Sequence, residues 1–140
     1  MVHSVSLASL SPAIVVHLAF AASALVLGPM ALSARKGSRF HRSMGYAFVT
    51  LIVGASLSSI FIRDFALPNL WGYTPIHILT VGSLVGVGMA LFAIAQRNFS
   101  AHKRGMWSVY LGGCVGAGAF ALMPGRYLGD LLWHHGLGLI

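Results

Sequence analysis

Four long apolar stretches constrain this chain more than any other feature. They cover residues 12–34, 43–62, 75–96 and 105–124, and an α-helix needs roughly 20 residues to cross about 30 Å of hydrocarbon. The chain is 57% hydrophobic and 8% charged, outside the usage of water-soluble domains. Because the connections are short, consecutive helices must run antiparallel. The sequence therefore predicts an all-α, integral membrane four-helix up-down-up-down bundle, with residues 1–140 as a single transmembrane domain.

The two ends of the chain add little to this bundle. The first ten residues lack the positive region of a secretory signal, so we expect the first apolar stretch to be retained. Residues 126–140 are too short to span and predict an interfacial segment that closes one end of the bundle. The single cysteine, Cys114, lies in the fourth stretch and is expected to be a small packing residue.

Basic residues gather on one side of the predicted bundle. Seven of the nine Lys and Arg residues fall in or just after the first and third loops: Arg35, Lys36, Arg39, Arg42, Arg97, Lys103 and Arg104. Such loops stay cytoplasmic, so we expect a multi-pass protein of the bacterial inner (cytoplasmic) membrane with both termini on the outer side. Arg63 and Arg126 lie on that outer side. The net charge of +7 sits beside apolar stretches, which favours contact with membrane lipid and argues against nucleic acid.

The chain contains an internal repeat. Each half holds a histidine, a glycine eleven residues later, and a second histidine 24 or 25 positions after the first: His17, Gly28 and His41 in one half, and His77, Gly88 and His102 in the other. The second histidine always follows a basic loop. The repeat unit is therefore a helical hairpin with one histidine near the start of each helix.

The repeat sorts the four histidines into two pairs at two depths. His17 and His77 enter from the outer face, and His41 and His102 enter from the cytoplasmic face. The members of each pair lie on diagonal helices, and the two pairs should be roughly 20 to 25 Å apart along the bundle. Two opposed imidazoles across a bundle core are what a bis-histidine haem iron requires. The sequence thus predicts two metal sites, His17 with His77 and His41 with His102, each suited to a bis-histidine haem; the resemblance described below implies that the haems are b-type.

Glycines and cations near the histidines are candidates for contact with such haems. Small residues could leave room for a flat macrocycle, although close helix packing also explains them: Gly45, Gly112 and Gly116. Cations could pair with the haem propionates, although each also determines topology: Arg39, Arg42, Lys103 and Arg104 on the cytoplasmic side, and Arg63 and Arg126 on the outer side. The remaining histidines lie outside the apolar stretches and are expected at the surface: His3, His134 and His135.

These residues resemble known families. The pattern is His-x-x-x-Ala, Gly28-Pro29, Lys36-Gly37, His41-Arg42-x-x-Gly45, His77 and His102-Lys103. Over nearly the whole chain it resembles a bacterial family of predicted four-helix membrane proteins, domain of unknown function 2306. The helical logic is similar to that of two-haem transmembrane cytochromes b, the group that includes ascorbate-linked ferric reductases. That resemblance implies one haem near each face and electrons passing between them, although those cytochromes commonly have six helices.

Three functions stay open from the sequence. The first is transmembrane electron transfer by a dihaem b-type membrane cytochrome, a membrane oxidoreductase whose electron donor could be a quinol. The second is a histidine-based transporter of metal ions or protons. The third is an accessory subunit of a larger membrane complex, or a homodimer, with histidines that serve helix packing. The sequence has no paired carboxylates in the bundle and no phosphate-binding glycine loop, which argues against hydrolysis.

Overall fold

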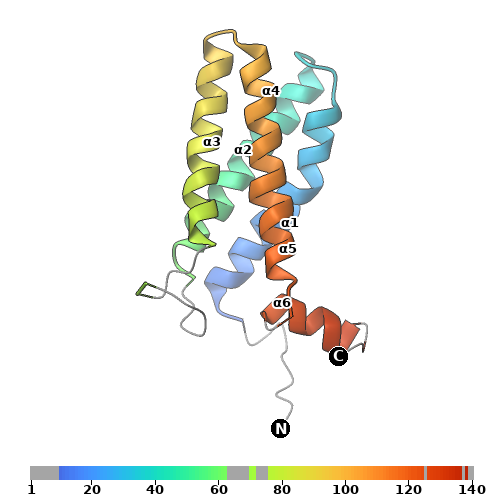
Figure 1. Ribbon diagram of the computed structural model, residues 1–140. Coiled ribbons are helices and arrows are strands. Elements are labelled where there is room, and N and C mark those ends of the chain that lie inside the picture. The colour runs from blue at the N-terminus through green and yellow to red at the C-terminus, as the bar shows by residue number, and fades with distance from the viewer. Residues whose placement is uncertain (1–9, 63–69, 72–75, 125, 137, 139–140) are drawn as a thin grey trace.

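A computed structural model describes residues 10–62, 70–71, 76–124, 126–136 and 138. The helical elements are, in order, α1 (Pro12–Ser33), α2 (Arg39–Ser59), α3 (His77–Ala95), α4 (Phe99–Ser108), the π-helical segment η2 (Val109–Gly116), α5 (Ala117–Ala121), α6 (Tyr127–Asp130) and the π-helical segment η3 (Leu131–Gly136). The predicted all-α class is confirmed (Figure 1). Because α4, η2 and α5 follow one another without a break, they form a single helical run over residues 99–121.

Polar caps determine where the second and fourth helices begin. Ser38 Oγ accepts a hydrogen bond from the backbone N–H of His41 at 3.0 Å. Asn98 Oδ1 accepts one from the backbone N–H of Ala101 at 3.1 Å. These caps satisfy N–H groups that have no partner inside the helix. The helices therefore begin at 39 and 99, four and six residues before the apolar stretches that hydropathy places at 43 and 105.

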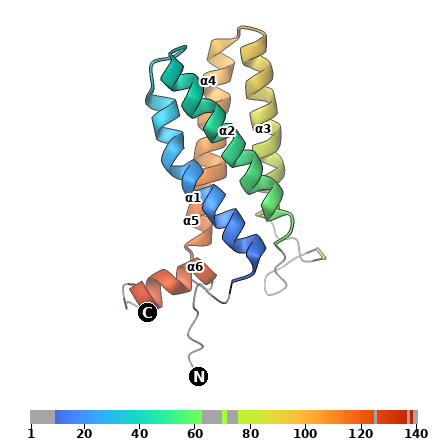
Figure 2. The same cartoon turned by 180° about the vertical axis from the view of Figure 1, so that it is seen from behind.

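The helices pack side by side. Helix α1 contacts α2, α2 contacts α3, α3 contacts α4 and η2, and η2 contacts α1. Figures 1 and 2 show the α1–α2 and α3–α4 connections at one end of the molecule and α6 at the other. This packing order leaves α1 diagonal to α3, and α2 diagonal to the α4–η2 run. His17 and His77 therefore lie on diagonally opposed helices, and so do His41 and His102.

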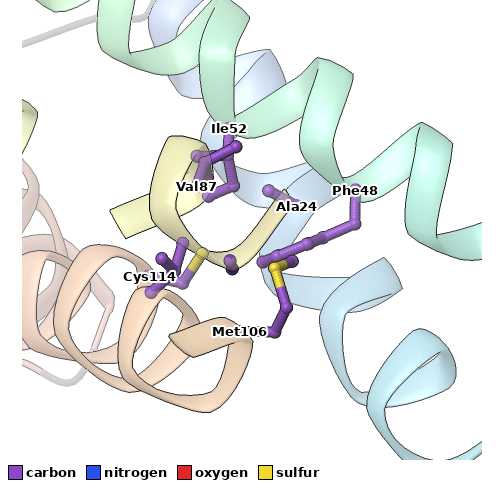
Figure 3. Packing of buried hydrophobic residues seen from close by; sticks show 8 residues of the cluster. Ala24, Phe48, Ile52, Val87, Met106 and Cys114 are labelled. Carbon is purple, nitrogen blue, oxygen red and sulfur yellow. The ribbon is translucent and has the colours of Figure 1, made fainter. Parts of the chain in front are cut away.

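A compact apolar core fills the middle of the bundle (Figure 3). It is built from buried residues near the midpoint of each helix: Ala24, Phe48, Ile52, Val87, Ala90, Met106, Val109 and Cys114. Phe48 is the largest of them, with 1% of its surface exposed. Its ring lies 6.1 Å from the ring centroid of Tyr110 at an angle of 58°, a tilted arrangement that aromatic pairs favour.

Helix α1 and segment η2 fit together through a proline, a glycine and a tyrosine. Pro29 lies inside α1 and has no N–H to donate to the carbonyl of Leu25, four residues earlier. Tyr110 of η2 donates its hydroxyl to that carbonyl at 3.1 Å. Gly28 makes the approach possible, since a Cβ atom there would lie 2.4 Å from the Tyr110 ring. The first and second hairpins are therefore joined by a contact that depends on all three residues.

The outer surface of the helices is apolar. Within the described residues, α1 and α3 are long and apolar enough to cross a membrane, with mean hydropathies of 2.0 and 2.2. Large side chains on these helices are widely exposed, among them Val26 at 66% and Ile78 at 73%. Large contiguous exposed apolar surface marks contact with lipid or with another protein. This exposed apolar surface agrees with a protein that is embedded in a membrane.

Candidate functional site

His17 and His77 line one cavity of about 420 Å³, at the end of the bundle where α6 lies. Cofactor sites typically occupy about 300 to 1,000 Å³ and have mostly apolar walls with a few polar groups. The walls here are mostly aliphatic and come from α1, α2, α3, η2 and α5. The other polar side chains in the lining are Ser56, Ser59, Thr80, Ser83 and Arg126. The structure thus brings the predicted outer pair to one cavity, which we call the outer cavity.

His17 is held by helix α2. Its Nδ1 lies 2.8 Å from the carbonyl oxygen of Ala55 and 3.3 Å from Ser58 Oγ. A carbonyl can only accept a hydrogen bond, so Nδ1 must carry the proton and donate it. In a neutral imidazole the lone pair is then on Nε2, which is the nitrogen left for a metal ion.

His77 is held through its other nitrogen. Its Nε2 lies 3.1 Å from the carbonyl oxygen of Ser59 and 3.2 Å from that of Ile62, at the end of α2. Ser59 also connects α2 to α3 through its hydroxyl, which is 2.8 Å from Thr80 Oγ1. In this ring orientation Nε2 is the donor, so coordination of a metal through Nε2 would require the ring to turn. The two histidines of the outer pair therefore differ in which nitrogen contacts the backbone.

His41 and His102 are held in the same way as each other. The Nδ1 of His41 lies 2.9 Å from the carbonyl oxygen of Ala31, and the Nδ1 of His102 lies 2.9 Å from that of Ala90. Each histidine lies near the start of its helix and reaches back to the preceding helix of its own hairpin. Each donates from Nδ1 and keeps the lone pair on Nε2. The internal repeat is thus visible as a repeated hydrogen bond at what we call the inner pair.

The predicted glycines lie away from the outer cavity. A Cβ atom at Gly45 or Gly112 would meet nothing within 4 Å, and one at Gly116 would lie 3.3 Å from a carbonyl of its own segment. Gly113 lines the outer cavity instead, and a Cβ there would lie 2.6 Å from Ser83 Oγ. Gly112, one residue earlier in η2, is not in the lining, and hydropathy does not distinguish the two neighbouring glycines.

The predicted cations divide between the two ends of the bundle. Those beside the inner pair are exposed near the starts of α2 and α4: Arg39, Arg42, Lys103 and Arg104. Arg126 lines the outer cavity, and its guanidinium carbon lies 4.0 Å from the Phe120 ring centroid, a cation–π geometry. Arg63 and His3 lie outside the described residues, as do the side chains of His134 and His135. Pairing of any of these cations with propionates stays a prediction.

The described residues contain no cluster of three or more His, Cys, Asp or Glu side chains that could hold a metal ion. A bis-histidine haem needs only two protein ligands, because the porphyrin supplies the other four nitrogens. Two histidines would suffice as the protein ligands of a haem iron, whereas a closed structural zinc site takes four ligands.

Comparison with known proteins finds a family match. The model of the family described as Predicted membrane protein (DUF2306) matches residues 14–133. This range holds all four histidines of the two pairs and every helix from α2 to α6. No curated protein and no solved structure matches the chain.

Proposed function

We propose, from the premise that this chain belongs to the predicted membrane protein family DUF2306, that it is a dihaem membrane cytochrome that moves electrons across the bilayer. In this proposal α1, α2, α3 and the run α4–η2–α5 are four membrane spans, with both termini on the outer side of a bacterial inner membrane. His17 and His77 would hold the outer haem, and His41 and His102 the cytoplasmic one. A bound b-type haem supplies a reversible one-electron carrier.

The observation that carries the proposal is how the histidines are held. The Nδ1 atoms of His17, His41 and His102 each donate to a backbone carbonyl at 2.8 to 2.9 Å. Histidines that bind metals usually donate their other ring N–H in this way, which sets the tautomer and the ring orientation. Three imidazoles at repeat-related positions are thus prepared for coordination through Nε2.

The outer cavity supports the fit of a haem to the outer pair. Its apolar walls suit a flat hydrophobic ring, and both candidate ligands lie on its lining. Arg126 places a cation in the same lining, where it can pair with an anionic group. The side chains of this chain would thereby surround the ring, provide nitrogen ligands from His17 and from His77 once its ring has turned, and keep bulk water away from the iron.

The apolar packing in the middle of the bundle favours electron transfer over transport of a metal ion or a proton. Ala31, whose carbonyl holds His41, follows His17 by 14 residues in α1, so the two levels are about 21 Å apart. The apolar core around Phe48 fills the space between them. A metal ion or proton would need a continuous polar path through this core, whereas an electron does not. Carriers also usually bind their cargo near the midplane, where this chain has buried apolar side chains.

Absorption spectroscopy of the purified protein tests the proposal. The chain would be expressed in haem-replete cells, purified in detergent, and measured as reduced-minus-oxidised spectra with a haem-to-protein ratio. We expect a Soret band, b-type α-bands and two haems per chain. Colourless protein, or the same spectrum after all four paired histidines are replaced by alanine, would contradict the proposal. A metal transporter would instead be colourless and carry bound metal.

Electron transfer across a bilayer needs its own measurement. Proteoliposomes would hold a trapped ferric acceptor inside, with an impermeant reductant outside. We expect acceptor reduction that depends on the protein and stops when one histidine of either pair is replaced. A coloured protein that leaves the trapped acceptor oxidised would support an accessory role in a larger complex.

A further inference from the structure

A small groove lies between α3 and the α4–η2 run, which pack side by side (Figure 1). Its volume is about 220 Å³. Glycine and serine make up most of its lining: Gly82, Ser83, Gly86, Ser108, Gly112 and Gly113. Gly82, Ser108 and Gly112 are exposed, so the groove opens to the outside of the bundle. We call it the glycine groove.

The glycines give the groove its shape. A Cβ at Gly86 would lie 2.8 Å from a side chain of the facing helix, and one at Gly113 would lie 2.6 Å from Ser83 Oγ, so these two glycines let the helices approach. A Cβ at Gly82 or Gly112 would meet nothing within 4 Å, so these two leave the space open. The groove therefore admits a flat ring, whereas an α-helix, about 10 to 12 Å across with its side chains, is too wide to enter it.

Two serine hydroxyls in the groove have no hydrogen-bond partner among the described residues: Ser83, with 9% of its surface exposed, and Ser108. The hydroxyls of Ser58 and Ser59, by contrast, donate to carbonyls of their own helix at 2.9 and 2.7 Å. Hydrocarbon offers no water to an unpaired hydroxyl, which therefore costs free energy in a membrane span. The groove thus favours a ligand that brings polar atoms to these two positions.

The two hydroxyls lie at different levels of the groove. The contacts between these antiparallel helices place Gly113 level with Ser83, and Gly105 level with Ala90. In this register Ser108 lies four or five residues from Ser83 along the shared axis, which is about 6 to 8 Å. Oxygens at opposite positions of a six-membered ring can serve two such levels, whereas a ligand with one oxygen can serve one.

We propose that the glycine groove binds the head group of a quinone, with Ser83 and Ser108 as its polar contacts. A quinone is a flat ring with two oxygens at opposite positions, and its apolar tail dissolves in the lipid around the bundle. Serine hydroxyls can donate to the carbonyls of a quinone and accept from the hydroxyls of a quinol. Leu79, Ser83 and Gly113 line both the groove and the outer cavity. Proximity of the ring to an outer haem rests on the proposed function, whereas binding of the ring requires no haem.

Photoaffinity labelling of the full chain tests the site. The chain would be placed in phosphatidylcholine nanodiscs, one chain per disc, and illuminated with an azidoquinone, with decylubiquinone as the competitor. We expect the labelled peptides to contain residues 79–86 or 108–113. The competitor concentration that halves the labelling gives an apparent Kd. Labelling that spreads over other helices, or that resists competition, would overturn the proposal.

Two matched glycine variants test the shape of the groove. Gly82 and Gly88 both lie on α3, and a Cβ at either would meet nothing within 4 Å, but Gly82 lines the groove and Gly88 does not. We expect G82V to raise the apparent Kd at least about tenfold, because its side chain occupies the space for the ring. G88V should leave the apparent Kd unchanged. Equal values in the two variants would overturn the proposal.

Serine variants test the polar contacts with little change in volume. A neutral hydrogen bond contributes about twofold to tenfold in affinity, so S83A and S108A should each raise the apparent Kd by such a factor. The control is S23A, because Ser23 is exposed on α1 and does not line the groove. An unchanged apparent Kd in S83A and S108A would overturn the assigned contacts.

The same preparations separate this proposal from the dihaem cytochrome. Their absorption spectra report haem, and the labelling reports quinone without turnover. Competed labelling of a colourless protein supports the groove site and contradicts the cytochrome, whereas a coloured protein without competed labelling overturns the groove site alone. Loss of labelling in larger discs that hold two chains would assign the groove to a second copy and overturn the quinone as its occupant.

Discussion

The two hairpins of the chain are alike at their second histidines and unlike at their first. His41 and His102 make the same Nδ1 contact at the same 2.9 Å to the preceding helix. His17 instead contacts α2 through Nδ1, whereas His77 contacts α2 through Nε2. The two halves thus share the hydrogen bond of the inner pair and differ at the outer pair, which lines a cavity.

The helices that carry the histidines differ as well. Hairpin one has a proline inside its first helix, and hairpin two has a π-helical segment inside its second. Both features interrupt the regular helical hydrogen bonding. They meet at the contact between α1 and η2, where the Tyr110 hydroxyl donates to the Leu25 carbonyl. Variants at equivalent positions of the two hairpins can therefore show which properties the hairpins share and which differ between them.

The largest expected effect comes from the histidines themselves. Replacing His41 or His102 by alanine should remove the same spectral component and lower the haem content from two per chain to one, because both would ligate one iron. Replacing His17 or His77 should remove the other component. Redox titration of each purified variant would check this, with His3→Ala as a control that keeps both haems. Loss of different spectral components in H41A and H102A would contradict the assignment of both histidines to one haem.

The outer cavity gives the next largest effect. Ala21 lines this cavity, whereas Ala19, on the same helix, is exposed on the outside. An aromatic ring at Ala21 would occupy the cavity, and overpacking of about 1.4 kcal/mol is a tenfold loss of binding. We expect A21F to lower occupancy of the outer haem by at least about tenfold and to spare the inner one. A19F is the matched control. Equal spectra for the two variants would show that the cavity is not the haem site.

The smallest effect compares the two repeat-related glycines. A Cβ at Gly28 would lie 2.4 Å from the Tyr110 ring, whereas a Cβ at Gly88 would meet nothing within 4 Å. We expect G28A to lower the free energy of unfolding by about 1 to 3 kcal/mol through overpacking. G88A should leave it unchanged or raise it by about 0.5 kcal/mol, since alanine is the better helix former. Denaturant titration in detergent measures both. Similar values for the two variants would contradict the asymmetry of the hairpins.

Much of the helical layout follows from hydropathy and caps. The apolar stretches placed the helices, and Ser38 and Asn98 explain why two of them begin earlier than hydropathy suggests. The π-helical turn of η2 could not be predicted, because it arises from packing and has no residue signature. Hydropathy also does not distinguish Gly113, which lines the outer cavity, from its neighbour Gly112, which does not.

For the histidines, too, the sequence predicted some features of the site and not others. Their number and spacing were readable from the repeat, because a repeated polar residue in an apolar helix stands out, and their pairing around two irons stays a prediction. The carbonyls that hold them were not readable, since any helix offers carbonyls at every turn. The place of Arg126 in the outer cavity depends on how the chain folds back after α5, where local sequence rules are weak.

The hydrogen bond from Tyr110 to Leu25 bears on how a duplicated hairpin finds its partner. Two equivalent hairpins could pair with copies of themselves in neighbouring chains as readily as within one chain. Here the acceptor is exposed by Pro29 in hairpin one, and the donor belongs only to hairpin two. Pairing of unlike hairpins satisfies both groups, whereas pairing of two first hairpins leaves a carbonyl without its donor. The contact therefore favours pairing of a first hairpin with a second hairpin over pairing of two first hairpins.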